Sequence, residues 1–134
     1  MNKQIINTTS APSPIGPYNQ AIFCGNMLFI SGQICLDAGS GELQNKDIRQ
    51  ETHQVMHNLR SILAAAGMSL ANVVKTTIFL TDMNQFSEVN EVYGKYFDGN
   101  FPARETVQVS ALPKFVNVEI SMIAIGSSSL LPAG

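Results

Sequence analysis

Apolar residues recur along this chain with two periods, which predict where helices and strands lie. Spacings of three and four over 47–66 predict a long helix. Its buried face consists of Ile48, Thr52, Val55, Leu59, Ile62, Leu63 and Ala66. Gly67 ends this helix, as a glycine in the left-handed conformation does. A second helix opens at Asp82, whose spacing to Gln85 resembles a capping box. Its apolar stripe is Phe86, Val89, Tyr93, Tyr96 and Phe97.

Runs rich in β-branched and aromatic residues predict six strands. They cover 3–6, 20–24, 27–33, 73–80, 106–110 and 116–125. Gly25 and Asn26 fit a tight hairpin turn between the second and third strands. The run 73–80 is largely apolar on both faces, so we expect it to lie inside the sheet and to be covered on both sides. The order of elements predicts a single α+β domain over residues 1–126.

Two helices can cover only one face of this sheet, yet the strands are apolar on both faces. In the last strand, Ile123 and Ile125 alternate with four other apolar residues. Charged residues make up only 13% of the chain, about half the usual share in a soluble domain. We therefore expect further copies of the chain to cover the second sheet face.

Charge and terminal sequence argue against several classes of partner. The net charge is -2 and the basic residues form no cluster, which disfavours nucleic acid and anionic membranes. No apolar run reaches the roughly 18 residues of a membrane span, and the N-terminal residues lack a signal peptide's apolar core. We expect a cytoplasmic protein in which Cys24 and Cys35 are buried free thiols. Residues 127–134 show no period and are predicted to form a disordered tail.

Arg104 is the first candidate for a functional side chain. It follows the turn-forming sequence Phe101-Pro102-Ala103 and precedes a predicted strand. Its guanidinium carries fixed donors that match a carboxylate at two points, which a lysine cannot do. A solvated arginine at the end of a strand is the alternative interpretation.

Three further segments place polar groups where the surrounding pattern is apolar or rigid. Glu119 interrupts an apolar strand, so it lies either at a solvated edge or partly buried, where its pKa would suit proton transfer. Tyr18 follows a Gly-Pro pair that would present its phenol from a stiff loop; a half-buried tyrosine is the alternative. Gly32, after Ser31, marks either a close backbone approach or a bulge.

Other patterns carry little chemistry on their own. His53 and His57 have a spacing that can bind zinc, but no third ligand is apparent, so we expect no metal site. Asn90 lies beside the apolar stripe of the second helix, where an asparagine is usually just solvated. The sequence contains no phosphate-binding loop, dinucleotide turn or serine nucleophile elbow.

Taken in order, six segments resemble the signatures of the RidA (YjgF-type) enamine/imine deaminases. They are Ile15-Gly16-Pro17-Tyr18, Ile30-Ser31-Gly32-Gln33, Val74 to Leu80, Phe86 through Val89-Asn90, Phe101-Pro102-Ala103-Arg104 and Val118-Glu119-Ile120. The resemblance runs from about residue 3 to residue 126. It implies a chorismate-mutase-like mixed sheet with two helices on one face, the other face lining a homotrimer barrel, and ligand clefts between subunits.

The resemblance also implies an activity. Members hydrolyse reactive 2-imino acids, such as 2-iminobutanoate and 2-iminopropanoate, to 2-keto acids and ammonia without a cofactor. By resemblance, Arg104 binds the substrate carboxylate, whereas Glu119 and Tyr18 handle the hydrolytic water. The matching pocket positions are Ser31, Gly32, Phe86, Asn90 and Thr106.

Thr106 departs from the pattern, because many bacterial members carry cysteine at this position. A thiol nucleophile is therefore excluded there, and water can attack the imine carbon directly. Two alternatives to an imine hydrolase remain. One is a non-enzymatic protein that binds small carboxylates in the same pocket, and the other is an endoribonuclease-type translation inhibitor, which the acidic balance disfavours.

Overall fold

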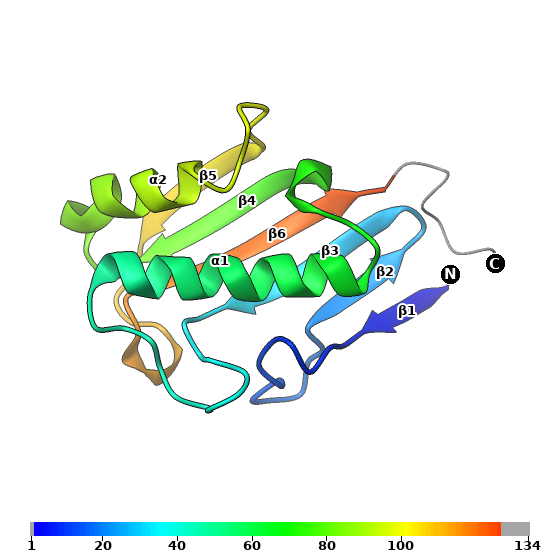
Figure 1. Ribbon diagram of the computed structural model, residues 1–134, viewed down its shortest axis with the longest axis horizontal. Coiled ribbons are helices and arrows are strands. Elements are labelled where there is room, and N and C mark those ends of the chain that lie inside the picture. The colour runs from blue at the N-terminus through cyan, green and yellow to red at the C-terminus, as the bar shows by residue number, and fades with distance from the viewer. Residues whose placement is uncertain (1, 127–134) are drawn as a thin grey trace.

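Within residues 2–126, which this computed structural model describes, six strands form one mixed sheet and two helices lie across one of its faces (Figure 1). The strand order is β1-β2-β3-β6-β4-β5. The strands are β1 (Lys3–Ile6), β2 (Ala21–Cys24), β3 (Met27–Gln33), β4 (Val73–Leu80), β5 (Ala103–Gln108) and β6 (Val118–Ile125). The helices are α1 (Ile48–Ala65) and α2 (Phe86–Gly94). The predicted disordered tail, 127–134, lies outside the described residues.

The predicted α+β architecture is confirmed, and most element bounds agree with the sequence pattern. Asp47 caps α1 by accepting a hydrogen bond from the Gln50 N–H at 2.8 Å, and Gly67 follows the helix with φ +74°. The hairpin between β2 and β3 pairs Cys24 with Met27, so Gly25 and Asn26 form its two-residue turn. Among the strands of residues 2–126, only β4 and β5 pair in parallel.

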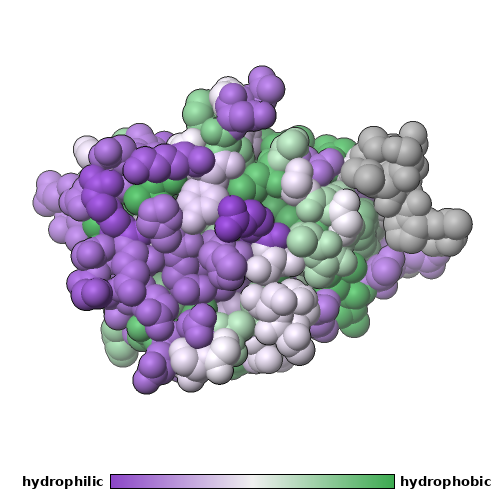
Figure 2. Space-filling view, viewed as in Figure 1, coloured by the Kyte–Doolittle hydropathy of each residue, from purple (hydrophilic) through white to green (hydrophobic). Residues whose placement is uncertain are grey.

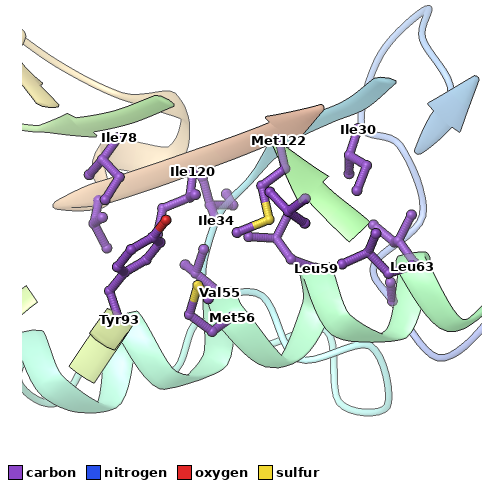
Figure 3. Packing of buried hydrophobic residues seen from close by; sticks show 14 of the residues in the cluster. Ile30, Ile34, Val55, Met56, Leu59, Leu63, Ile78, Tyr93, Ile120 and Met122 are labelled. Atoms are coloured by element: carbon purple, nitrogen blue, oxygen red, sulfur yellow. The ribbon is translucent and has the colours of Figure 1, made fainter. Parts of the chain in front are cut away.

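The hydrophobic core fills the space between the helices and one face of the sheet (Figure 3). From α1, fully buried Val55, Leu59 and Leu63 point toward the strands. The sheet contributes alternate residues, including Ile78 of β4 and Ile120 of β6. The apolar face predicted for α1 also contains two fully buried polar residues, which the apolar pattern does not reveal: Glu51 and Asn58.

The opposite face of the sheet, which we call the open face, carries no helix among the described residues. Ile5, Phe29 and Val107 are exposed large apolar side chains on this face. By contrast, Figure 2 shows the helix side, where hydrophilic residues gather over α2 and the N-terminal half of α1. The predicted apolar second face is thus confirmed, and its covering by further copies of the chain stays a prediction.

Four sequence predictions need correction. β5 begins at Ala103 rather than at residue 106, because its parallel pairing with β4 starts there. β6 begins at Val118 rather than at residue 116, because the chain forms a short 3₁₀ turn, Pro113–Phe115, before it. Asp82 caps a 3₁₀ turn, Met83–Gln85, that precedes α2. α2 ends at Gly94, so Tyr96 and Phe97 of its predicted apolar stripe lie beyond the helix. β4 lies inside the sheet as predicted, and the cover of its second face stays a prediction.

Candidate active site

Arg104 projects from β5 toward the helix side of the sheet. It lies opposite Thr76 of β4, and Thr76 is fully buried under α2, where its hydroxyl meets that of Tyr93 at 3.0 Å. The Arg104 guanidinium carbon lies 5.1 Å from the ring centroid of Tyr93 and 5.5 Å from that of Phe86. Both rings attract the cation and restrict its rotation. Arg104 is therefore a held side chain, and the interpretation as a freely solvated strand-end residue is wrong.

A cleft of about 430 Å³ opens beside the guanidinium. Its walls come from Asn90, Tyr93, Gly94, Phe101 and Pro102, so α2 and the turn before β5 enclose Arg104 from two sides. Burial raises the pKa of Tyr93, while its hydrogen bond to Thr76 and the Arg104 charge oppose that rise. The phenol therefore stays neutral near pH 7 and presents a ring face to the cation.

Thr106 follows two residues after Arg104 and lies on the same side of β5. Its hydroxyl oxygen is buried and makes no hydrogen bond to any described residue. A buried polar group without a partner is uncommon in a folded protein, and such a group often awaits a ligand or a water molecule. Thr106 shares a face of β5 with Arg104, and its role as a pocket residue stays a prediction.

Glu119 projects from the other face. Its neighbours in β6, Val118 and Ile120, are fully buried on the helix side, so alternation directs Glu119 to the open face. Because β6 lies between β3 and β4, the interpretation of Glu119 as an edge glutamate is wrong. The side chain is half-buried, and this desolvation raises its pKa above the usual value for a glutamate.

Gly32 contacts Glu119 across the bulge in β3. The pairing of β3 with β6 shifts between Ile30 and Gln33, which marks the bulge. A Cβ atom on residue 32 would lie 2.6 Å from Glu119 Oε2, closer than any real contact of this kind. Both sequence interpretations of this glycine are therefore confirmed, because it lies in a bulge and also permits a close approach.

Ser31 and Gln20 connect this bulge to the loop that carries Tyr18. The Ser31 hydroxyl donates to the Asn19 carbonyl at 2.6 Å, and its N–H donates to the Gln20 carbonyl at 2.9 Å. The buried Gln20 amide donates to three loop carbonyls and accepts the Thr8 N–H at 2.7 Å. Sequence reasoning missed Gln20, because nothing local distinguishes it from a solvated glutamine.

Tyr18 lies at the mouth of a small pocket beside Glu119. Its side chain is 44% exposed, and its hydroxyl accepts the Ile15 N–H at 3.2 Å. The pocket wall also includes Gly32 and Pro113. Tyr18, Ser31, Gly32 and Glu119 therefore form one group, which we call the glutamate group.

Phe86, Asn90, Arg104 and Thr106 form a second group, the arginine group, on the helix side of the same sheet. Paired residues of neighbouring strands share a face, and Arg104 pairs with buried Thr76 whereas Glu119 pairs with Phe79 on the open face. A sheet separates the two groups. One small molecule therefore cannot touch Arg104 and Glu119 of the same chain.

One histidine of the pair considered as a metal site forms another contact among the described residues. His53 Nδ1 pairs with the Tyr96 hydroxyl at 2.8 Å. Among residues 2–126 no three histidine, cysteine or acidic side chains gather as a metal site would require. Cys24 and Cys35 are free thiols as predicted, although Cys24 is only half-buried. No described helix has the length and apolarity needed to cross a membrane.

Comparison with known proteins assigns the family. The family profile described as endoribonuclease L-PSP matches residues 8–126. The chain belongs to the RidA (YjgF/L-PSP) family. A RutC family protein of Pyrococcus horikoshii is 53% identical over 91% of this chain and 97% of its own. The human 2-iminobutanoate/2-iminopropanoate deaminase is 47% identical over 92% of this chain and 90% of its own.

A solved structure supports the fold assignment. Escherichia coli TdcF with bound serine superposes with a TM-score of 0.89 at 42% identity, over 92% of this chain and 99% of that one. The family resemblance seen in the sequence is thus confirmed, as is the mixed sheet with two helices on one face.

The contact between Gly32 and Glu119 predicts the effect of an added methyl group. Gly32→Ala should destabilise the fold by about 1–3 kcal/mol, because the new Cβ overlaps Glu119 Oε2 and the carboxylate must move. Urea unfolding measures the loss. Gly39→Ala is the matched control, since its Cβ would make only an ordinary contact at 3.5 Å. Equal stability of both variants and the parent would contradict the close approach.

Proposed function

We propose that this chain is a cofactor-independent imine hydrolase, a 2-iminobutanoate/2-iminopropanoate deaminase that releases 2-keto acids and ammonia. The observation that supports it best is the composition of the two groups: a held arginine in one and a half-buried carboxylate of raised pKa in the other. The first matches a substrate carboxylate and the second matches an attacking water. Mammalian relatives at 46–49% identity carry this activity in their names.

In this proposal the two groups can meet only between subunits, and we infer a homotrimer from the family resemblance. In a ring, each subunit contacts the next through two different surfaces, so the open face of one meets another part of its neighbour. Such a contact brings the glutamate group of one subunit to the arginine group of the next. The exposed apolar residues of the open face favour burial of this kind. The substrate cleft then lies between subunits, and each trimer holds three clefts.

The reaction follows from the groups in that cleft. Arg104 binds the carboxylate of the 2-imino acid and fixes the imine carbon relative to the neighbouring subunit's glutamate group. Water adds to the C=N carbon, and the Glu119 carboxylate accepts the proton that the water loses. Protonated Glu119 returns this proton to the nitrogen, which gives a neutral carbinolamine. The hydroxyl proton of the carbinolamine then passes through Glu119 to the nitrogen, so that ammonia leaves as the C=O bond forms.

Two side chains, Tyr18 and Glu119, orient the attacking water and accept its proton. Tyr18 donates a hydrogen bond to the water or to the tetrahedral intermediate, since its side chain lines the same pocket as Glu119. Burial raises the pKa of Glu119, which makes its carboxylate a stronger base than an ordinary glutamate. No electron is transferred in this hydrolysis, so the named residues and water account for every bond change. We place the reaction in the cytoplasm, where thiols such as Cys35 stay reduced.

One assay separates this function from its alternatives. An amino-acid oxidase or dehydratase generates the imine, and semicarbazide traps whatever the protein leaves. The proposed hydrolase lowers the trapped amount in proportion to its concentration. A protein that only binds small carboxylates would bind 2-keto acids and leave the trapped amount unchanged. A ribonuclease would cleave RNA in a salt-sensitive manner and likewise leave the imine.

The arginine group predicts that charge alone cannot replace Arg104. Arg104→Lys should lower kcat/KM nearly as much as Arg104→Ala, because lysine keeps the charge and loses the paired donors. We expect a loss of about a hundredfold for either variant, the scale of a misplaced substrate. Arg60→Lys is the control, because Arg60 stacks on Tyr96 away from the cleft. A fully active Arg104→Lys protein would exclude two-point binding.

The glutamate group predicts a loss of base catalysis. Glu119→Gln should lower kcat about a hundredfold and leave 2-keto acid binding nearly intact, because the base is lost while Arg104 remains. The parent's rate should also fall as the pH drops through the raised pKa of Glu119, since the protonated carboxyl cannot accept a proton. The variant should lack this acid limb. Exposed Glu42→Gln serves as the control, and a Glu119→Gln protein with the parental rate and pH profile would remove Glu119 from the mechanism.

A further inference from the structure

Glu51 of α1 is a fully buried carboxylate whose hydrogen bonds all reach the start of β6. Oε2 accepts the backbone N–H groups of Asn117 and Val118 at 2.7 and 2.9 Å, and Oε1 accepts the Asn117 side-chain amide at 2.8 Å. No lysine, arginine or histidine among the described residues forms an ion pair with it. A buried carboxylate without such hydrogen bonds would be strongly unfavourable, so these three donors are what allow Glu51 to be there.

Glu51 binds the end of segment 113–118, and both ends of this segment adjoin the proposed hydrolytic site. Pro113, at the beginning of the segment, forms part of the pocket wall beside Tyr18. Glu119, just beyond its end, is the proposed base. A residue that fixes this segment therefore fixes two walls of one pocket.

The same segment contains backbone that does not hold its shape unaided. Lys114 and Phe115 have φ values of +54° and +55°, in the left-handed region that is strained for residues other than glycine. Phe115 is 88% exposed, so its ring gives the turn no packing within this chain. Val116, the next residue, is buried in the hydrophobic core. Backbone hydrogen bonds hold part of this segment: the Phe115 N–H donates to the Leu112 carbonyl at 2.9 Å, and the Thr81 N–H donates to the Asn117 carbonyl at 3.1 Å. Glu51 adds a side-chain acceptor that begins at Asn117, two residues after the strained pair.

We propose that Glu51 is a positioning residue for imine hydrolysis: it fixes the start of β6 so that Glu119 lies against Gly32 and faces the pocket. The Val118 N–H is one residue from Glu119, and a shift of one residue in a strand turns every side chain to the opposite face. Glu51 acts through hydrogen-bond geometry rather than through its charge. The kinetic part of this inference rests on the proposed function, whereas the structural part does not.

Substitutions at Glu51 distinguish geometry from charge. In Glu51→Gln, the amide oxygen can accept both backbone N–H groups while its NH₂ donates to the Asn117 side chain after that amide turns over. In Glu51→Asp, the charge stays but the carboxylate retracts by about 1.5 Å, one carbon–carbon bond. In Glu51→Met, the shape remains and all three donors lose their acceptor.

We expect kcat for imine hydrolysis to fall in the order parent, Glu51→Gln, Glu51→Asp, Glu51→Met. The glutamine variant should stay within about threefold of the parent, and the methionine variant should lose about a hundredfold, the scale of a misplaced base. KM should change little throughout, because Arg104 lies on the opposite face of the sheet. Thr52→Val is the control: it removes a neighbouring fully buried hydrogen bond of α1, from Thr52 Oγ1 to the Ile48 carbonyl, and should leave kcat unchanged.

A second readout needs no activity. NMR titration of the Glu119 side-chain carboxyl should show its raised pKa in the parent, in Glu51→Gln and in Thr52→Val. The pKa should return toward the ordinary value in Glu51→Met, because a displaced Glu119 becomes solvated. If the parent clears no imine, the proposed function fails and this titration still tests the positioning role.

Three results would overturn the inference. One is a folded Glu51→Met protein with parental kcat and a parental Glu119 titration. Another is a Thr52→Val protein that loses kcat as much as Glu51→Met does, which would make the effect one of stability alone. The third is Glu51→Gln being more damaging than Glu51→Asp, since that order would assign the effect to charge. The comparison of Glu51→Gln with Glu51→Asp distinguishes hydrogen-bond geometry from charge even if Glu51→Met fails to fold.

Discussion

In β6, every second side chain points toward the helices, and Glu119 occupies one of the positions that point away. Arg104 of β5 pairs with a β4 residue that points toward the helices. This alternation, a consequence of extended backbone geometry, places the two most informative charged residues on opposite faces of a single sheet. The proposed cleft between subunits follows from this separation of Arg104 and Glu119. Substrate binding and water activation can meet only where one subunit's open face contacts its neighbour.

Buried polar side chains hold each half of the site in place. Gln20 fixes the loop before Tyr18 through four hydrogen bonds, and Glu51 fixes the start of β6 through three. Asn58 of α1 donates to the carbonyls of Ile34 and Leu36, two residues that line the pocket beside Glu119. Because each buried amide or carboxylate finds its full set of partners, these contacts rigidify the pocket at little cost in stability. Preorganised polar groups of this kind suit a reaction that needs alignment more than chemical activation.

Much of the fold could be predicted from the sequence because its signals are local. The period of α1, its Asp47 cap and its Gly67 terminator gave bounds within one residue at each end, and the apolar run of β4 gave its bounds without error. The start of β5 could not be predicted, because Ala103 and Arg104 lack strand character and join the sheet only by pairing with β4. Glu51 was not identified, since its donors lie 66 and 67 residues away in sequence. Likewise, the choice between an exposed and a half-buried Glu119 required the strand order.

Subunit mixing tests the composite cleft most directly. Arg104→Ala and Glu119→Gln trimers, each expected to be about a hundredfold less active than the parent, are unfolded together in equal amounts and refolded. If every cleft combines Arg104 of one subunit with Glu119 of the next, about a quarter of the clefts in the random trimers regain both native residues, and about a quarter of parental imine clearance returns. Mixed trimers without any recovered activity, although assembled from both variants, would show that Arg104 and Glu119 act within one chain and would contradict the account.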